Sequence, residues 1–187
     1  MAWQLGFNET FFEDVHVPVG NRVGDENRGW YVSVTLMDFE RSRIRQAVGA
    51  LRQLRNLFDY LETDEGRSRS RTSTHDSLRH ELADRAMEVE VAFHLAFRVV
   101  SMQAKGIVPN YEASMLQMSI FETNQRMAGT EAKLFGLYSN VWEGEYAPRD
   151  GATARGYVSA VASTIAGGTV EIQRNIIATR GLGLPRG

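Results

Sequence analysis

Apolar residues recur at steps of three and four along three long stretches of this chain, and this spacing restricts the fold more than any other feature. Such a period places apolar side chains on one face of an α-helix. The spacing predicts long helices over residues 27–62, with Asn27 as N-cap, 76–105 and 111–138. The three apolar stripes are, in chain order, Leu36, Phe39, Ile44, Val48, Leu51, Leu54 and Phe58; Leu78, Leu82, Met87, Val91, Leu95 and Val99; and Met115, Met118, Ile120, Phe121, Met127, Ala128, Leu134 and Phe135.

The remaining segments are shorter. Residues 152–165 and 169–181 predict two more helices, because Gly167 and Gly168 interrupt the pattern between them. Residues 7–24 are rich in Val and Phe and predict an extended segment that must lean on another surface. Residues 63–73 predict a polar connector. Because short connections favour antiparallel neighbours, we expect an all-α fold, an up-and-down four- to five-helix bundle with a short extended N-terminal segment.

The composition is that of an ordinary globular protein, with 43% hydrophobic and 24% charged residues among 187. The formal net charge of −2 gives no overall attraction to nucleic acid or to an anionic membrane, and we expect neither as a partner. The absence of cysteine excludes disulfides, thiolate metal sites and a cysteine nucleophile. Since no apolar run would span a bilayer and no signal peptide is recognisable, we expect a cytoplasmic protein.

The histidines do not form a metal-ligand pattern. His75 and His80 are five residues apart, which is poor spacing for one helical face, and no HExxH sequence occurs. We therefore expect no metal site. The alternating Arg and Ser of residues 63–73 can bind RNA or phosphate, but no aromatic residues interleave with the arginines, so a solvated connector is favoured.

A carboxylate and a guanidinium are adjacent at Glu40 and Arg41, beside the apolar stripe of the first predicted helix. Partial desolvation of a carboxylate favours its use as a general base, and Arg41 could orient it. A surface ion pair is the usual role of Glu-Arg on a helix. Periodicity alone favours the ion pair.

The turn at Gly167-Gly168-Thr169 can bend sharply and allow close approach of another group. Thr169 would cap a helix whose free N–H groups favour a negative group such as phosphate. A simple kink between two packed helices explains the same residues equally well. The physical argument leaves both interpretations open.

Two groups of residues resemble the acyl-CoA dehydrogenase family. Residues 12–18 (FEDVHVP), 24–30 (GDENRGW) and 38–42 (DFERS) are similar to the family's passage from its central β-domain into the first helix of the C-terminal bundle. Residues 165–178 (IAGGTVEIQRNIIA) and 182–186 (LGLPR) are similar to the family's C-terminal signature. The resemblance covers essentially the whole chain, with residues 1–26 expected to be the end of the β-domain or a linker and residues 27–187 the C-terminal helical bundle.

The resemblance implies FAD-dependent oxidation of an acyl-CoA to the trans-2-enoyl-CoA, in which a glutamate removes a proton from Cα as a hydride leaves Cβ. Many members carry that glutamate just before the Gly-Thr of the tail, where this chain has Gly167. Other members carry it on the first bundle helix, at the position of Glu40. The resemblance therefore makes Glu40 the expected base and Arg41 its orienting partner, with Asp38 close to the acyl-CoA.

Gly168, Thr169 and Glu171 match positions that approach FAD in the family, and Glu171 replaces a residue that is often glutamine. Two family motifs have no match here. One is the Arg-x-x-Phe-Gly sequence after the first bundle helix, and the other is a Gly-Gly pair expected near residues 140–150.

Full members of the family also contain an N-terminal helical domain and a central β-domain. We therefore expect this chain to be incomplete and inactive by itself, and to form a homo-oligomer or to join a partner subunit that supplies those domains. In the complete enzyme, the resemblance implies an electron-transfer flavoprotein as the partner that accepts electrons. The alternative is a non-catalytic bundle fragment or subunit that serves oligomer assembly.

Overall fold

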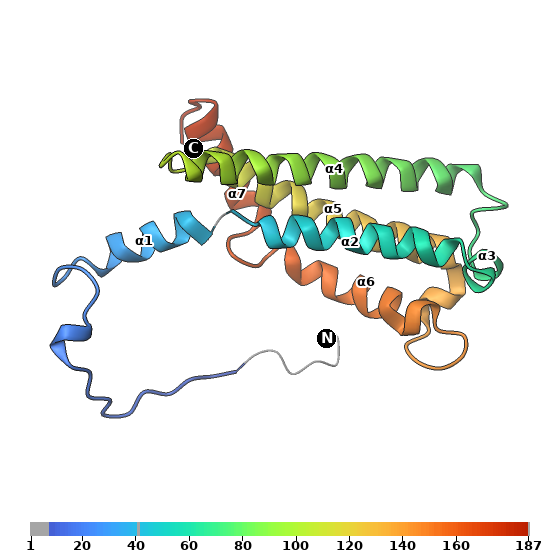
Figure 1. Cartoon of the computed structure of the whole chain (residues 1–187), viewed down its shortest axis with the longest axis horizontal. Helices are drawn as coiled ribbons and strands as arrows, with labels where there is room; N and C mark the ends of the chain where they lie inside the picture. The colour runs from blue at the N-terminus through green and yellow to red at the C-terminus, as the bar shows by residue number, and fades with distance from the viewer. Residues whose placement is uncertain (1–7, 41, 187) are drawn as a thin grey trace.

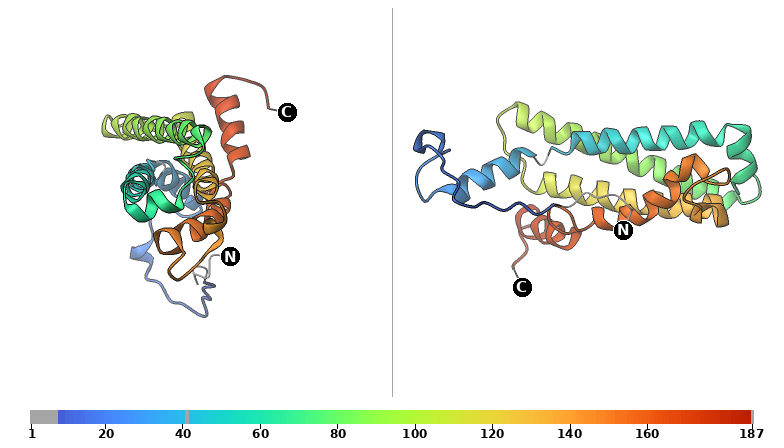
Figure 2. Two further views of the ribbon diagram at one scale, coloured as in Figure 1. Left: turned by 90° about the vertical axis from the view of Figure 1, so that its right-hand side faces the viewer. Right: turned by 90° about the horizontal axis from the view of Figure 1, so that it is seen from below.

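Four helices lie side by side and alternate in direction along the chain in the computed structural model, which describes residues 8–40 and 42–186 apart from the side chains of 38 and 39. They are α2 (Ile44–Leu61), α4 (Asp76–Ala104), α5 (Tyr111–Phe135) and α6 (Ala152–Ser163). Figures 1 and 2 show that α5 lies in the middle, with α2, α4 and α6 around it. No strand occurs in the described residues. The expected all-α, up-and-down bundle is confirmed.

Shorter elements complete the chain. They are the 3₁₀ helix η1 (Val19–Asn21), α1 (Gly29–Glu40), α3 (Asp64–Arg69), the 3₁₀ helices η2 (Gly136–Asn140) and η3 (Pro148–Gly151), α7 (Val170–Ile176) and the π-helical turn η4 (Ile177–Gly181). The expected helix 111–138 ends at Phe135, because Gly136 takes a positive φ of 55° and the chain continues as a 3₁₀ turn. The last helix begins after Thr169, as predicted.

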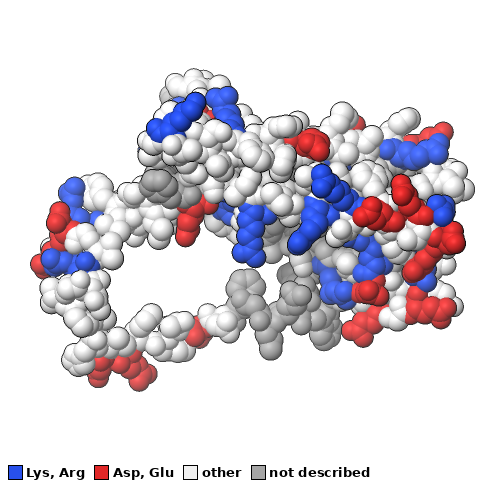
Figure 3. Space-filling model, viewed as in Figure 1, with Lys and Arg blue, Asp and Glu red and all other residues white. Residues whose placement is uncertain are grey.

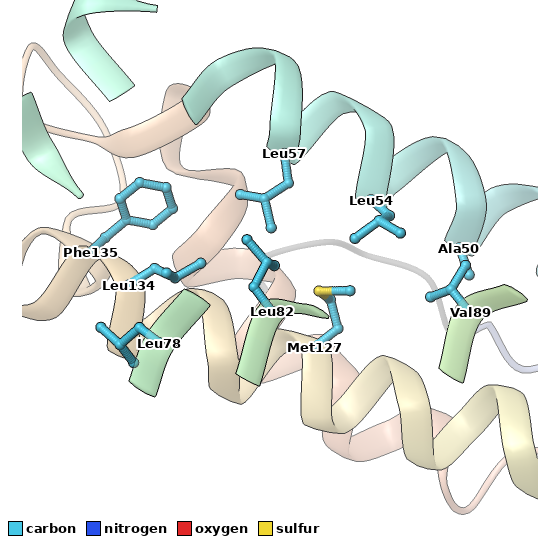
Figure 4. Close-up of a cluster of buried hydrophobic side chains, with 9 residues drawn as sticks. All are labelled: Ala50, Leu54, Leu57, Leu78, Leu82, Val89, Met127, Leu134 and Phe135. Atoms are coloured by element: carbon cyan, nitrogen blue, oxygen red, sulfur yellow. The ribbon is translucent and has the colours of Figure 1, made fainter. Parts of the chain in front are cut away.

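Two clusters of buried apolar side chains hold the bundle together. The first joins α2, α4 and the second half of α5 (Figure 4), and consists of Ala50, Leu54, Leu57, Leu78, Leu82, Val89, Met127, Leu134 and Phe135. The second joins the same helices toward their other end and includes Val170 of α7. Burial of these side chains is the main term that stabilises the packed helices. The second cluster also fixes the start of α7 against α5.

The apolar stripe predicted for α4 was partly wrong. Leu78, Leu82 and Val99 are buried, but Met87 and Val91 are 60% and 57% exposed. By the helical period of about 100° per residue, these two positions lie about 140° and 180° around the helix from Leu82. The buried face instead continues through Val89 and two alanines, Ala92 and Ala96, whose small side chains allow close helix packing.

The single helix expected over residues 27–62 is divided into α1 and α2. Arg43 stands at the N-cap of α2 with a left-handed φ of 47°, which a continuous α-helix does not accommodate. Asn27 is not the N-cap of α1. The carbonyl of Arg28 accepts the first helical hydrogen bonds, from the N–H groups of Tyr31 and Val32 at 3.0 and 3.4 Å. Helix α1 ends at Glu40.

The polar connector expected over residues 63–73 contains a short helix. Thr63 caps α3, and its hydroxyl accepts a hydrogen bond from the Gly66 N–H at 2.9 Å. Ion pairs from Arg67 to Asp64 and from Arg69 to Glu65 support the turn. The connector is polar, as predicted, and also contains this short helix, which the sequence analysis did not anticipate. The arginines of α3 are engaged with nearby carboxylates.

Residues 8–28, which we call the N-terminal arm, and α1 extend away from the bundle (Figures 1 and 2). The arm exposes Phe11, Phe12, Val15, Val17, Val19 and Val23, and Phe12 is 80% accessible. Trp30 of α1 is 75% exposed. Exposed apolar surface of this extent is unusual for an isolated soluble domain. The described part of the arm is exposed along its length, and the surface expected to cover it stays a prediction.

We predict that Leu57→Ala lowers the free energy of unfolding by about 2–5 kcal/mol, because Leu57 is fully buried between α2, α4 and α5. Urea denaturation followed by circular dichroism measures the change. Leu137→Ala is the matched control, since Leu137 is 89% exposed, and it should shift the free energy by about 0.5 kcal/mol or less. Equal effects of the two substitutions would contradict the packing described for the first cluster.

Candidate functional site

A glycine turn connects α6 to α7 at the end of the bundle where α2 begins. Gly167 and Gly168 have φ values of 66° and 94°, in the left-handed region that glycine adopts without strain. The Val170 N–H donates to the Thr164 carbonyl at 3.2 Å and closes the turn. Thr169 then caps α7, with its hydroxyl accepting from the Ile172 N–H at 3.4 Å. Both glycines are exposed on the outer side of the turn.

Gln117 of α5 holds the inner side of this turn. Its side chain is buried, and its Nε2 lies 3.3, 2.9 and 3.0 Å from the carbonyl oxygens of Ala166, Gly167 and Gly168. Gln173 of α7 adds a contact from its own Nε2 to the Gly168 carbonyl at 3.3 Å. Three consecutive carbonyls of the turn therefore point into the bundle, toward amide donors.

Arg43 brings the junction of α1 and α2 to the same place. Its Nη2 donates to the Gln117 Oε1 at 3.1 Å, and its guanidinium lies 5.2 Å from the centre of the Phe121 ring. A Cβ built on Gly167 would come within 2.6 Å of that Nη2, so the guanidinium packs directly against the turn. The structure thus joins residues 43, 117 and 166–168, which are far apart in sequence.

The residues singled out from the sequence lie around this junction or outside the described part. Glu40 is the last residue of α1, three positions before Arg43, and it is exposed. Asp38 belongs to α1, but its side chain is outside the described residues, as is the whole of Arg41. Gly168, Thr169 and Glu171 form the turn and the first residues of α7. The roles assigned to these residues stay predictions.

Glu171 turns back onto the start of its own helix. Hydrogen bonds from its own backbone N–H and from the Thr169 hydroxyl lower the pKa of its carboxyl group, and Arg174 lowers it further. A carboxylate at a helix N-terminus compensates the free N–H groups there. Since an ionised carboxylate only accepts hydrogen bonds, Glu171 can meet only N–H or O–H groups of a ligand.

Sequence reasoning missed Gln117 and Arg43. A signal for Gln117 was present, because it falls on the buried face of α5 with Ala113, Ile120 and Phe121. A polar residue in such a position needs partners inside the protein. No local pattern marks Arg43, whose contact is made with a residue 74 positions away.

A second polar cluster lies between α5 and α6, around a cavity of about 250 Å³. The carboxylate of Glu131 accepts from Arg149 Nη1 at 2.8 Å and from the Thr153 hydroxyl at 3.4 Å. Burial raises the pKa of Glu131, and Arg149 and Thr153 oppose the shift. None of the candidate catalytic, cofactor-binding or substrate-binding residues predicted from the sequence lines this cavity. Its polar lining suits water or a small polar molecule.

The described residues hold no group of three or more His, Asp or Glu side chains placed to bind a metal ion. Within the same residues, no helix combines the length and the apolar character that a membrane crossing requires. Basic and acidic side chains are interspersed over the bundle (Figure 3), which leaves no large surface of one sign on this face. This distribution agrees with the small net charge of −2.

Comparison with known proteins points to one family. The family model described as "Acyl-CoA dehydrogenase, C-terminal domain" matches residues 27–182. Acyl-CoA dehydrogenase FadE26 of Mycobacterium tuberculosis is 28% identical over 184 residues, which cover 95% of this chain and 45% of that protein. The mitochondrial long-chain specific acyl-CoA dehydrogenase of Sus scrofa is 28% identical, over 91% of this chain and 38% of that protein.

Solved structures agree. The acyl-CoA dehydrogenase of Geobacillus kaustophilus superposes with a TM-score of 0.73 at 29% identity, over 93% of this chain and 44% of that one. The ChsE4–ChsE5 complex of Mycobacterium tuberculosis gives a TM-score of 0.72 at 27% identity, over 95% of this chain and 46% of that one. This chain spans less than half the length of the curated relatives it matches.

We predict that the start of α7 loosens in acid because of Glu171. Its pKa is lowered in the folded chain, so its stabilising contribution is present above the ordinary pKa of glutamate and is lost as pH falls through the lower, folded value. Between pH 7 and about 3, an NMR titration should show the Ile172 amide losing protection in the native sequence but not in Glu171→Gln. Glu143→Gln, at an exposed loop position, should behave like the native sequence. A Glu171 carboxyl that titrates in the ordinary glutamate range would count against the interaction.

Proposed function

Because this chain belongs to the acyl-CoA dehydrogenase family, we propose that it forms the C-terminal bundle of an FAD-dependent enzyme that oxidises an acyl-CoA thioester to the trans-2-enoyl-CoA. The observation that carries the proposal is the contact chain from Arg43 through Gln117 to residues 166–168. It supports a site shared by the end of α1 and the glycine turn. These are the two regions in which the family resemblance places base and flavin contacts.

The domain arrangement is part of the proposal. Residues 1–26 would be the end of a central β-domain or a linker, and residues 27–187 the helical bundle. The relatives are more than twice as long as the matched region, which supports a pocket completed by other segments or by a partner subunit. The exposed apolar arm supports such a covering partner, whether in a homo-oligomer or in a mixed assembly.

The residues of the glycine turn fit the FAD that the family uses. Gly167 and Gly168 are exposed, so a group outside the bundle can reach their main chain. A Cβ at Gly168 would lie 2.8 Å from Gln173 Nε2, and the φ of 94° would strain any residue with a side chain there. Gly168, Thr169 and Glu171 would hold the flavin, with Glu171 as an acceptor for its N–H or O–H groups. When bound, FAD supplies an acceptor for the hydride from Cβ.

Glu40 is the proposed base. Its carboxylate would take the proton from Cα as the C–H bond at Cβ breaks, and the double bond forms between these two carbons. Arg41 would orient the carboxylate and Asp38 would lie near the acyl-CoA. Glu40 is exposed in this chain, so substrate and covering segments would have to exclude water from it. Electrons would then pass from the flavin to an electron-transfer flavoprotein. The cytoplasmic location of the protein stays a prediction.

A second candidate function is assembly alone. The exposed apolar residues of the arm and of α1 favour it, because they offer a surface for another chain without requiring chemistry at Glu40. In this case the bundle would be a non-catalytic subunit. Flavin absorbance of the purified assembly distinguishes the two functions, and we expect the isolated chain to be nearly colourless.

We predict that Glu40→Gln lowers the rate of acyl-CoA oxidation roughly 10²-fold or more, because glutamine cannot accept the Cα proton. The assay uses the chain combined with the remaining domains, in one polypeptide or as separate subunits, and follows electron transfer from an acyl-CoA to a dye.

Glu62→Gln is the control, since Glu62 is an exposed glutamate just after α2. It should leave the rate unchanged. Full activity in Glu40→Gln would remove Glu40 from the mechanism. Absence of flavin and of activity in the unsubstituted assembly would favour the assembly function.

A further inference from the structure

We infer that Gln117 is a positioning residue that holds the glycine turn in shape before any cofactor binds, and that couples the turn to the α1–α2 junction through Arg43. If the proposed function holds, this coupling means that the flavin region at the glycine turn and the base region at the end of α1 move as one unit. The inference rests on the proposed function for that consequence only. Its structural content concerns this chain alone.

The amide of Gln117 is surrounded by more acceptors than it has protons. Its NH₂ group carries two protons, whereas three carbonyl oxygens lie 2.9–3.3 Å from the nitrogen. At least one proton is therefore shared between neighbouring carbonyls. All three oxygens converge on one point that belongs to another helix. A turn left to itself would direct its carbonyls to water.

Arg43 defines which way the amide faces. A guanidinium only donates and a carbonyl only accepts, so Oε1 must face Arg43 and Nε2 must face the turn. In the opposite orientation, the NH₂ group of Gln117 would face the Arg43 guanidinium, donor against donor. Its Oε1 would then face the carbonyls of the turn, acceptor against acceptor. The burial of Gln117, which is 2% exposed, makes such a mismatch costly. The amide is thus locked by its surroundings.

The turn depends on this restraint because glycine does not restrain itself. Gly167 and Gly168 have the widest choice of backbone conformation of any residue, and fixing them has a correspondingly large entropic cost. A side chain is disfavoured at Gly167. A Cβ on Gly167 would press on Arg43 Nη2 at 2.6 Å, and φ of 66° would strain it. External hydrogen bonds therefore have to define the conformation.

The same contact reaches the junction of α1 and α2. Arg43 is the residue with left-handed φ that separates the helices, and its guanidinium packs between Gln117, Phe121 and Gly167. A shift of the turn would displace the Arg43 side chain and with it the end of α1. In the proposed enzyme this would keep Glu40 and Gly168 in a constant relation, which preorganisation of a site requires.

The test is an NMR measurement on the purified chain without cofactor. In the native sequence, Gly167 and Gly168 should show backbone order parameters of about 0.85, typical of a rigid backbone. Gln117→Met has nearly the same length but no donor, and should lower both values below about 0.6. It should also speed hydrogen exchange of the Val170 amide, which closes the turn, roughly tenfold or more.

Two further variants separate the contact of Gln117 with the turn from its contact with Arg43. Gln117→Glu keeps an acceptor for Arg43 but places carboxylate oxygens against the carbonyls, so it should loosen the turn as Gln117→Met does. If Gln117→Met does not fold, Gln117→Glu provides the test in its place. Arg43→Met should loosen the turn in the native background and have a smaller effect in the Gln117→Met background, because part of its influence on the turn passes through Gln117.

Thr130→Val is the matched control. Thr130 is buried on the same helix and donates to Glu81 at 3.0 Å, about 20 Å along α5 from Gln117. It should lower overall stability without changing the order parameters of the turn. Unchanged glycine order in both Gln117 variants, or equal loosening by Thr130→Val, would overturn the inference. Since no readout uses catalysis, an inactive assembly would refute the proposed function and leave this result standing.

Discussion

Helix α5 is in contact with α2, α4, α6 and α7, and the burial of most of its circumference determines the rest of the structure. A helix covered on several sides cannot satisfy its buried polar side chains with water, so most of them need partners elsewhere in the protein. Gln117 finds its partners in the glycine turn and Arg43, Thr130 in Glu81, and Glu131 in Arg149. These contacts fix the register of α5 against each neighbour. Apolar burial alone would allow the helices to slide or rotate.

The parts of the fold that could be predicted are those with local causes. Helix α4 begins at Asp76 as expected, and Gly106 ends it with a positive φ of 73°. Thr169 caps α7 because its hydroxyl can reach the N–H three residues later. Within the candidate site, the glycines and Thr169 were recognisable because their backbone and capping properties are intrinsic to the residue type.

The parts that could not be predicted depend on contacts between distant residues. No proline or glycine marks the break between α1 and α2, because the left-handed Arg43 is stabilised by its contact with α5. The buried face of α4 was misplaced because Ala92 and Ala96 carry little weight in an apolar pattern, yet they pack fully. Gln117 could have been recognised as buried, but its partners are on α2 and after α6. In the proposed enzyme, the side of the site at Glu40 would be completed by surfaces outside this bundle, which the sequence of the bundle does not describe.

The N-terminal arm has a consequence for how such a protein has to be made in a cell. Phenylalanine and valine side chains in an unpaired segment are what chaperones and proteases recognise on unfinished proteins. The bundle can bury its own core, but chaperones and proteases would continue to bind a newly made chain until its arm is covered. In the assembly proposed above, the supply of the covering segment would therefore set the lifetime of the newly made bundle.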